Sequence, residues 1–334
     1  MIVATGITRT FAGRGRRSTP VHALRQVDLT IPDGGAVSFI GESGCGKTTL
    51  GRILCGLEGF DGGELTIDGQ PVSRLRERQR APLFRRIQMI HQDPYSALNP
   101  TRTIANILGD PLALRARQLG KPDDWIAGRR AELLGLVGLD PGYVLPRYPH
   151  MLSGGMRQRV VIARALTVDP EVLVADEAVS MIDVSLRLGI LRLLRDLRSE
   201  LGISLLFITH DVATARYVGQ DGELYVIYRG AVVEHGSTDT VIQRPVHPYS
   251  QCLLSAIPVL RGIEEPGPDR LIPLAPLEER VEPPGCLFQP RCPFARDDCA
   301  GRQPPLGRLG DTEQEHACRY PQNREVVAVP AANA

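Results

Sequence analysis

One glycine-rich run constrains the fold more than any other part of the chain. Residues 41–48, Gly-Glu-Ser-Gly-Cys-Gly-Lys-Thr, fit the pattern G-x-x-x-x-G-K-[ST]. An apolar run at 35–40 precedes it, and Lys47–Leu57, with glycine only at 51 and 56, is typical of a helix. In a strand, glycine turn and helix of this kind, backbone N–H groups and the positive helix end surround phosphate oxygens. The sequence therefore predicts a phosphate-binding loop, and the alternative is a chance glycine turn before a helix.

The residue types in this loop suit a nucleoside triphosphate with Mg²⁺. Lys47 supplies a positive charge to the β- and γ-phosphates, and Thr48 supplies a hydroxyl group to Mg²⁺. The residues predicted to bind the nucleotide here are Gly41, Ser43, Gly44, Cys45, Gly46, Lys47, Thr48 and Thr49.

Polar side chains follow two further apolar runs. Val172–Ala175 ends in Asp176 and Glu177, and Ile203–Thr209 ends in His210. Short strands entered from helices predict an α/β fold with a parallel sheet, whose carboxyl ends share one ligand-binding edge. There Asp176 would hold Mg²⁺ and Glu177 would orient and deprotonate the attacking water. Alternatively, the two acids merely solvate the end of a strand.

Composition narrows the class of protein. The chain has 334 residues, enough for about two domains. With 43% hydrophobic and 23% charged residues, a disordered, collagenous or coiled-coil chain is excluded. A formal charge of +1 gives no general attraction to nucleic acid or anionic lipid. No apolar run approaches the roughly 18 residues of a membrane span, and residues 1–17 lack a signal core, so we expect a cytoplasmic chain.

Two domains are expected, at 1–256 and 257–334. The first carries a helical insertion at about 85–166, which several prolines divide into short helices. The second begins with a proline-rich linker, from Ile257 to Cys286, that excludes a long helix. Val327–Ala334 is apolar and small and is expected to be a frayed tail.

Residues 152–159, Leu-Ser-Gly-Gly-Met-Arg-Gln-Arg, resemble the LSGGQ signature of ATP-binding cassette (ABC) proteins. Gln92 in HQDPYSALNP, Ser180–Asp183 and His210 complete the motifs of this family in its order, and the match covers most of Phe11–Pro258. The resemblance implies an ABC cassette of the P-loop NTPase class. Such a cassette has a RecA-like parallel sheet, a β subdomain and a helical insertion.

The resemblance also implies roles for single residues. Gln92 would contact Mg²⁺ and water, and His210 would contact the γ-phosphate, although a histidine there could instead cap a helix or fill the core. Phe11 is a candidate for stacking on adenine, with a core role as the alternative. The residues expected to complete the ATP site in the cassette dimer are Ser153, Gly154, Gly155 and Asp183. The first three open a helix expected to begin near Met156, and its N–H groups form a second anion site.

The closest resemblance is to the oligopeptide, dipeptide and nickel importers, through HQDPYSALNP, HPYSQCLLSAIP (247–258) and GCLFQPRCPFARDDC (285–299). It implies a peripheral subunit on the cytoplasmic face of the inner membrane. Its partners would be a second cassette, usually a different chain, two membrane subunits and, indirectly, an extracytoplasmic solute-binding protein, with no nucleic acid. MIDVSLR and THDVATARY also resemble a subset that imports oligosaccharides, so peptide, oligosaccharide and nickel cargo stay open. The alternatives are a soluble cassette protein and an iron–sulfur protein with a vestigial ATPase.

The chain departs from the family after the catalytic glutamate, where Ala178-Val179 replaces the usual Pro-Thr. Without the proline we expect a more relaxed backbone beside Glu177 and slower hydrolysis.

Four of the seven cysteines, Cys286, Cys292, Cys299 and Cys318, lie near the C-terminal end. Their spacing lacks the short C-x-x-C pairs of common zinc sites. Four thiolates suit Zn²⁺ or a [4Fe–4S] cluster, and the wide spacing favours the cluster. The extension of dipeptide permease ATPases resembles this pattern and in some members carries such a cluster. The alternative is a set of reduced thiols that packs a loop-rich domain.

Overall fold

The fold is described from a computed structural model. It covers residues 1–12, 19–256, 265–266, 274, 282–324 and 326–328. Most of the predicted proline-rich linker and residues 329–334 of the predicted tail lie outside these described residues.

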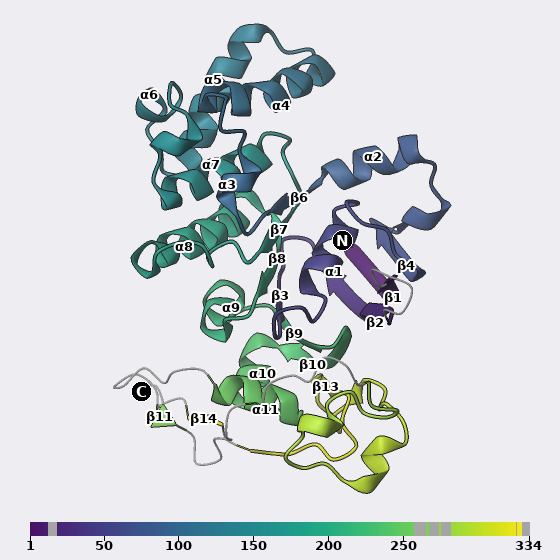
Figure 1. Cartoon of the computed structure of the whole chain (residues 1–334). Coiled ribbons are helices and arrows are strands. Elements are labelled where there is room, and N and C mark those ends of the chain that lie inside the picture. The colour runs from purple at the N-terminus through teal and green to yellow at the C-terminus, as the bar shows by residue number, and fades with distance from the viewer. Residues whose placement is uncertain (13–18, 257–264, 267–273, 275–281, 325, 329–334) are drawn as a thin grey trace.

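A parallel sheet runs through the middle of the molecule (Figure 1) and confirms the predicted α/β architecture. Its order is β12-β13-β10-β9-β3-β8-β7-β6. The parallel strands are β3 (Ala36–Ile40), β6 (Ile87–Ile90), β7 (Val172–Asp176), β8 (Ser204–Thr209) and β9 (Glu223–Tyr228), and β10 (Ala231–Ser237) is antiparallel to β9. All residues of β3, β7 and β8 are buried, which explains their continuous apolar runs.

Helices cover this sheet: α1 (Lys47–Leu54), α8 (Val184–Leu201), α9 (Val212–Gly219), α10 (Thr238–Gln243) and α11 (Pro248–Ser255). The predicted helix at Lys47–Leu57 thus ends three residues early. Gly51 lets α1 approach the sheet closely, because a Cβ atom there would lie 2.9 Å from Ile208 Cδ1 and 3.1 Å from Val174 Cγ1.

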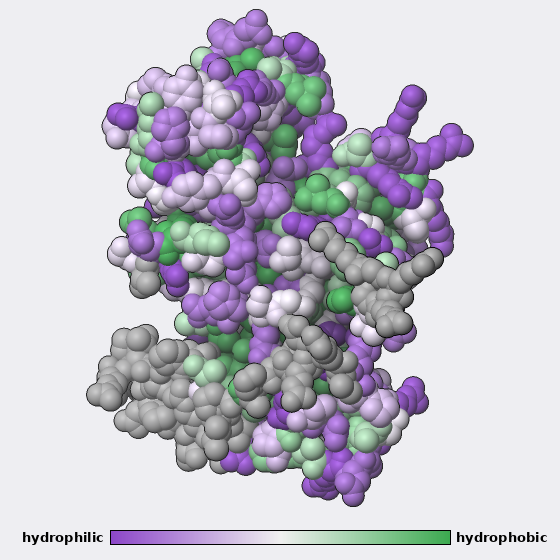
Figure 2. Space-filling model, viewed as in Figure 1, coloured by the Kyte–Doolittle hydropathy of each residue, from purple (hydrophilic) through white to green (hydrophobic). Residues whose placement is uncertain are grey.

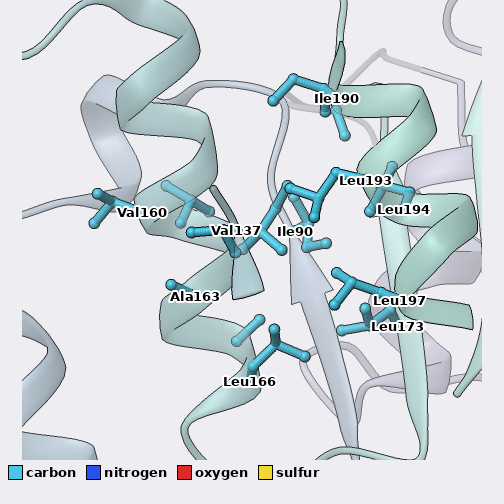
Figure 3. Packing of buried hydrophobic residues seen from close by; sticks show 14 of the residues in the cluster. Ile90, Val137, Val160, Ala163, Leu166, Leu173, Ile190, Leu193, Leu194 and Leu197 are labelled. Carbon is cyan, nitrogen blue, oxygen red and sulfur yellow. The ribbon is translucent and has the colours of Figure 1, made fainter. Parts of the chain in front are cut away.

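The helical region comprises α3 (Pro94–Ala97), α4 (Ile104–Leu119), α5 (Asp123–Leu136), α6 (Pro141–Val144), the 3₁₀ turn Pro149–Met151 and α7 (Gly154–Leu166). It begins after β6, so residues 87–90 belong to the sheet and not to the insertion expected at about 85–166. One hydrophobic cluster continues from Val160 and Leu166 of α7 through Leu173 of β7 to Leu194 of α8 (Figure 3). The helical region and the sheet therefore share a core.

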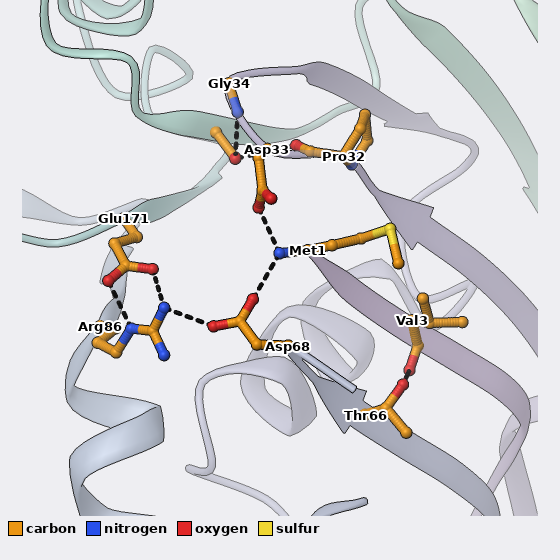
Figure 4. A network of polar contacts seen from close by, with 10 residues as sticks. Met1, Val3, Pro32, Asp33, Gly34, Thr66, Asp68, Arg86 and Glu171 are labelled. Carbon is orange, nitrogen blue, oxygen red and sulfur yellow. Dashed lines mark hydrogen bonds and ion pairs between the residues drawn. The ribbon is translucent and has the colours of Figure 1, made fainter. Parts of the chain in front are cut away.

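A second, antiparallel sheet has the order β2-β1-β4-β5 and forms the β subdomain. Its strands are β1 (Ile2–Phe11), β2 (Val21–Ile31), β4 (Gly62–Ile67) and β5 (Gln70–Pro71), followed by the 3₁₀ turn Val72–Arg74 and α2 (Glu77–Arg85). Arg86 joins this subdomain to the main sheet (Figure 4). Its guanidinium bonds Asp68 at 2.6 Å and also Glu171, while Asp68 accepts a bond from the Met1 amino group.

The C-terminal segment is rich in loops, as expected, but it extends the main sheet. β12 (Gly307–Arg308) pairs with β13 (Glu315–His316), which pairs with β10. The remaining elements are β11 (Glu265–Pro266), β14 (Val327–Ala328) and the 3₁₀ turns Gln289–Arg291 and Asp297–Ala300. Leu287, Phe288 and Val326 join a core cluster with Tyr228 and Tyr249, so this segment packs onto the cassette.

The face shown in Figure 2 mixes hydrophilic and hydrophobic residues. Among the helices in the described ranges, none is long and apolar enough to cross a membrane.

Candidate functional site: a nucleotide-binding edge

The phosphate loop links β3 to α1 at the carboxyl end of the parallel strands, as predicted. Gly44 and Gly46 have positive φ angles, 78° and 106°, which L side chains rarely adopt. A Cβ atom on Gly46 would lie 2.1 Å from the Ala23 carbonyl oxygen, and one on Gly41 would lie 2.3 Å from that of Ile227. Glycine is therefore required here by both backbone conformation and close packing.

Lys47 lies inside this loop and is 5% exposed. Its ammonium group donates hydrogen bonds to the carbonyl oxygens of Gly41 (2.7 Å) and Glu42 (2.9 Å). Ser43, Gly44 and Thr48 are exposed, whereas Thr49 is half-buried, so much of the loop faces open space. Cys45 is buried, and burial raises the pKa of its thiol, which argues against a reactive cysteine in the loop.

The predicted magnesium ligands Thr48 and Asp176 meet across the sheet edge. The Thr48 hydroxyl donates a hydrogen bond to Asp176 Oδ1 at 3.1 Å. Burial raises the pKa of Asp176, whose side chain lies at the end of β7. Hydroxyl and carboxylate oxygens are ligands that Mg²⁺ prefers, so the two residues fit the ion.

The three predicted catalytic residues are close together. Gln92 Nε2 donates a hydrogen bond to Glu177 Oε2 at 3.0 Å, and His210 Nδ1 lies 3.3 Å from Glu177 Oε1. The Glu177 side chain is 16% exposed and that of His210 is 58% exposed. This exposure excludes a core role for His210, and Asp211 rather than His210 caps α9. Its side chain stands at the open edge of the site beside the predicted base.

Hydrogen bonds hold the backbone turn at Glu177, and the relaxation expected without proline stays a prediction. Glu177 has a φ of 46°, and its N–H group donates to the Ile208 carbonyl at 2.9 Å. Its own carbonyl accepts bonds from the N–H (3.0 Å) and hydroxyl (2.9 Å) of Ser180. Ala178 and Val179 are buried below this turn, 1% and 5% exposed. Here burial and hydrogen bonds hold the turn that a proline ring would otherwise stiffen. The expected slower hydrolysis stays a prediction.

The signature residues open α7, which begins at Gly154 rather than near Met156. Ser153 is the N-cap, and its hydroxyl accepts a hydrogen bond from the Met156 N–H at 3.3 Å. A Cβ atom on Gly154 would meet nothing within 4 Å, whereas one on Gly155 would lie 3.2 Å from Leu186 Cδ1 of α8. Asp183 is exposed at the N-cap position of α8 and makes no side-chain cap bond there. The start of α7 is thus open to solvent at Gly154.

Phe11 ends β1 and pairs with Val21 of β2. Its ring is half-buried, and the Arg9 guanidinium lies 4.7 Å from the ring centroid. Because β2 also carries Ala23, which contacts Gly46, this strand end lies near the phosphate loop. Adenine stacking by Phe11 stays a prediction.

All four C-terminal cysteines line one small pocket. Burial raises the pKa of Cys292 to about 12 and that of Cys318 to about 11. Phe288, Phe294 and Pro304 contribute to the lining, which is nearly all apolar. Within the ranges that the structure describes, no three His, Cys, Asp or Glu side chains form a group that could hold a metal ion.

Sequence reasoning missed one part of the site. Arg291, one residue before Cys292, pairs with Glu42 of the phosphate loop, 249 positions away. Neither residue belongs to a catalytic pattern, and only the folded chain brings them together.

A phosphate loop, a carboxylate pair at the end of β7 and a capped signature helix are the parts of an ATP-binding cassette. The family model of ABC transporters matches residues 24–180, and that of the oligopeptide/dipeptide transporter C-terminal region matches residues 233–299. The dipeptide transport ATP-binding protein DppF of Escherichia coli is 41% identical over 300 residues, covering 87% of this chain and 85% of that protein. The di/tripeptide transport ATP-binding protein DppF of Pseudomonas aeruginosa is 37% identical over 324 residues, with 96% and 97% covered.

Among solved structures, a dimeric ATP-binding cassette in a post-hydrolysis state with ADP and Pi has a TM-score of 0.63 and 29% identity. The match covers 71% of this chain and 99% of that one. The chain belongs to the ABC transporter family, as an ATP-binding subunit of the oligopeptide/dipeptide importer group. This membership decides against the soluble cassette and the vestigial ATPase.

Proposed function

We propose that this subunit hydrolyses ATP at the edge formed by the phosphate loop, Asp176 and Glu177, with Glu177 as the general base. The observation that carries the proposal is the placement of Glu177, whose two carboxylate oxygens are engaged by Gln92 and His210. Next to it, Thr48 and Asp176 offer oxygen ligands for the Mg²⁺ that accompanies ATP.

The chemistry follows from these positions. Lys47 and the loop N–H groups neutralise the β- and γ-phosphates. Glu177 accepts a proton from water as the water oxygen bonds to the γ-phosphorus and the bond to ADP breaks. Gln92 and His210 orient the carboxylate of Glu177 from its two oxygens, and beside it Gln92 would contact Mg²⁺ and the water and His210 the γ-phosphate. Ser153, Gly154, Gly155 and Asp183 would act from a second cassette, where the open helix start meets the γ-phosphate.

The test is Glu177→Gln in the assembled transporter. We expect ATP hydrolysis to fall at least ~100-fold while ATP still binds, because an amide cannot take the proton. Glu200→Gln, an exposed residue on α8, is the matched control and should behave like the parent. Hydrolysis by Glu177→Gln at the parent rate would show that another group is the base.

The assembly we propose contains two cassettes, of which the second is a different chain, below two membrane subunits at the cytoplasmic face of the membrane. Support comes from the family and from the dimeric form of the similar cassette. To test this, the chain is co-purified with the membrane subunits and the mass of the complex is measured. A stable homodimer of this chain in the active complex would contradict the heterodimer.

Peptide is the cargo we propose over oligosaccharide or nickel, since the C-terminal region matches that of oligopeptide/dipeptide transporters. ATPase stimulation by a dipeptide-loaded binding protein, but not by one loaded with oligosaccharide or nickel, is the expected result. Stimulation by the binding protein loaded with oligosaccharide or nickel, and not by the dipeptide-loaded one, would show that peptide is not the cargo.

We also propose that the cysteine pocket holds a [4Fe–4S] cluster. Support comes from the four thiols that line one pocket and from their wide spacing along the chain, which suits a group of several iron atoms better than the short pairs of common zinc sites. The cluster, when bound, would cross-link the loops that carry Cys286, Cys292, Cys299 and Cys318. Anaerobic purification should give about four iron atoms per chain, and Cys292→Ser should lower this number whereas Cys252→Ser should not. A protein without iron would refute the proposal.

A further inference from the structure

An ion pair joins the cysteine-bearing segment directly to the phosphate loop. The two terminal nitrogens of Arg291 donate to the two carboxylate oxygens of Glu42, at 2.7 and 2.8 Å. Only 8% of the Arg291 side chain and 32% of the Glu42 side chain are exposed. A bidentate pair of this geometry fixes both distance and orientation.

The backbone of Arg291 is held within the C-terminal segment. Arg291 ends the 3₁₀ turn Gln289–Arg291, and its N–H group donates to the Phe288 carbonyl at 3.0 Å. The Arg291 guanidinium also donates to the hydroxyl of Tyr228, in β9 of the cassette, at 3.3 Å. Its position is therefore set by the loop that lies between Cys286 and Cys292.

Glu42 transmits this position to the groups that face phosphate. Its N–H group donates to the Tyr249 hydroxyl at 3.0 Å, and its carbonyl accepts the Lys47 ammonium bond at 2.9 Å. A shift of the Glu42 side chain thus moves the backbone that holds Lys47.

Aromatic rings fill the space beside the ion pair. The rings of Tyr228, Tyr249 and Phe288 lie 4.6 to 5.4 Å apart between centroids. Phe288 also lines the cysteine pocket. Close-packed rings leave little room for independent movement of the two sites.

We propose that Arg291 is a positioning residue that holds the phosphate loop, through Glu42, in the conformation that receives ATP. The affinity for ATP then depends on the cysteine-bearing segment, whatever occupies its pocket. This inference rests on the proposed use of the Lys47 loop as the ATP site.

The test compares Arg291→Gln, Arg291→Lys and the double variant Glu42→Gln/Arg291→Gln in the assembled transporter. We expect Arg291→Gln to raise the KM for ATP about tenfold with a smaller change in kcat, because the loop is misplaced before the chemical step. Arg291→Lys should be intermediate, since one ammonium cannot bridge both carboxylate oxygens. The double variant should keep most of the loss, because it also lacks the link between Arg291 and Glu42. Full recovery would trace the loss to an unpaired Glu42 charge and overturn the positioning role.

The control is Glu282→Ala, which breaks another ion pair between this segment and the cassette, at Arg25, without touching Glu42. Its KM should stay within about twofold of the parent value.

Amide exchange separates positioning from general destabilisation. Arg291→Gln should speed exchange in residues 41–48 and leave the buried strand β8 unchanged, whereas equal loosening of both would overturn the inference. A parental KM for Arg291→Gln would also overturn it. Activity that survives Lys47→Ala would instead overturn the proposed ATP site.

Discussion

The nucleotide-binding edge and the C-terminal attachment use polar residues in opposite ways. At the edge, Ser43, Thr48 and His210 are exposed and face open space. At the attachment, Glu234 and Gln314 are buried and bond to each other at 2.7 Å. Polar groups left open are available to a ligand, whereas polar groups closed on one another hold the chain together. Changes at the edge should therefore reduce activity, and changes at the attachment should reduce stability.

The largest expected effect is on activity at the open edge. Lys47→Ala removes the charge that faces the phosphates, and ATP hydrolysis by the assembled transporter should fall more than ~100-fold. The midpoint of thermal unfolding should also fall, but by much less, because two hydrogen bonds from Lys47 to the loop carbonyls are lost. Lys121→Ala, an exposed residue just beyond α4, is the matched control and should retain parental activity. Hydrolysis within tenfold of the parent would argue that this loop does not bind ATP.

A glycine pair sharpens the comparison within the loop itself. Gly46→Ala combines a positive φ with a clash against the Ala23 carbonyl and should cost about 2–4 kcal/mol of unfolding free energy. Gly44→Ala has a positive φ but open space around its Cβ, so we expect about 1 kcal/mol. Chemical denaturation of both variants measures the difference. Equal losses would show that the backbone conformation alone requires glycine at these positions.

The sequence predicts a feature of the fold when the residues that form it lie close together in the chain, and misses it when they are far apart. Gly46 and Lys47 belong to a fixed loop pattern before α1, and Asp176 ends an apolar strand, so the loop, the sheet and the edge they share could be predicted. The Arg291–Glu42 pair could not, because packing of segments 249 positions apart creates it. The attachment of β13 to β10 involves two residues on each strand, too few to show a strand period. The turn at Glu177 is held by hydrogen bonds to Ile208 and Ser180, which the sequence does not show.

At the closed attachment, Gln314→Ala should reduce stability and leave the nucleotide site intact. Gln314 donates to Glu234 at 2.7 Å and to the Arg244 carbonyl at 3.0 Å. Without Gln314, the buried Glu234 carboxylate and the Arg244 carbonyl each lose a hydrogen-bond donor. This loss should lower the free energy of unfolding by about 2 kcal/mol. Denaturant unfolding measures this cost, with Gln118→Ala on the exposed face of α4 as the control. An unchanged unfolding free energy would mean that these hydrogen bonds do not stabilise the fold. A raised KM for ATP would show that the attachment also affects the nucleotide site.

The smallest effect expected is on the pH dependence of the β13 attachment. Burial lowers the pKa of His235, but its contacts with Glu223 (3.1 Å) and Glu315 (3.3 Å) outweigh burial and raise the pKa overall. Tyr225 stacks on the ring at 4.0 Å. Because the pKa is higher in the folded state, the charged histidine stabilises the attachment fully below pH ~6.5, and this contribution is lost as the pH rises through the folded value. Its size should be about 0.5–1 kcal/mol.

Amide exchange at Ala317, whose N–H group donates to Val233 at 2.8 Å, is the measurement. Protection should fall about twofold to fivefold from pH 6 to 8 after correction for intrinsic rates, and His235→Gln should remove this change. Buried Glu234, with a pKa of about 7, titrates in the same range, so the difference between the parent and His235→Gln isolates the histidine. The pKa of Glu234 is raised on folding, so the unfolded chain loses this proton at lower pH than the folded chain does. The free energy of unfolding therefore falls as the pH rises to about 7, and above that pH the contribution of Glu234 is constant. A pH dependence that persists in His235→Gln would therefore belong to Glu234, and the attachment would be held by a buried carboxylate rather than by a charged histidine.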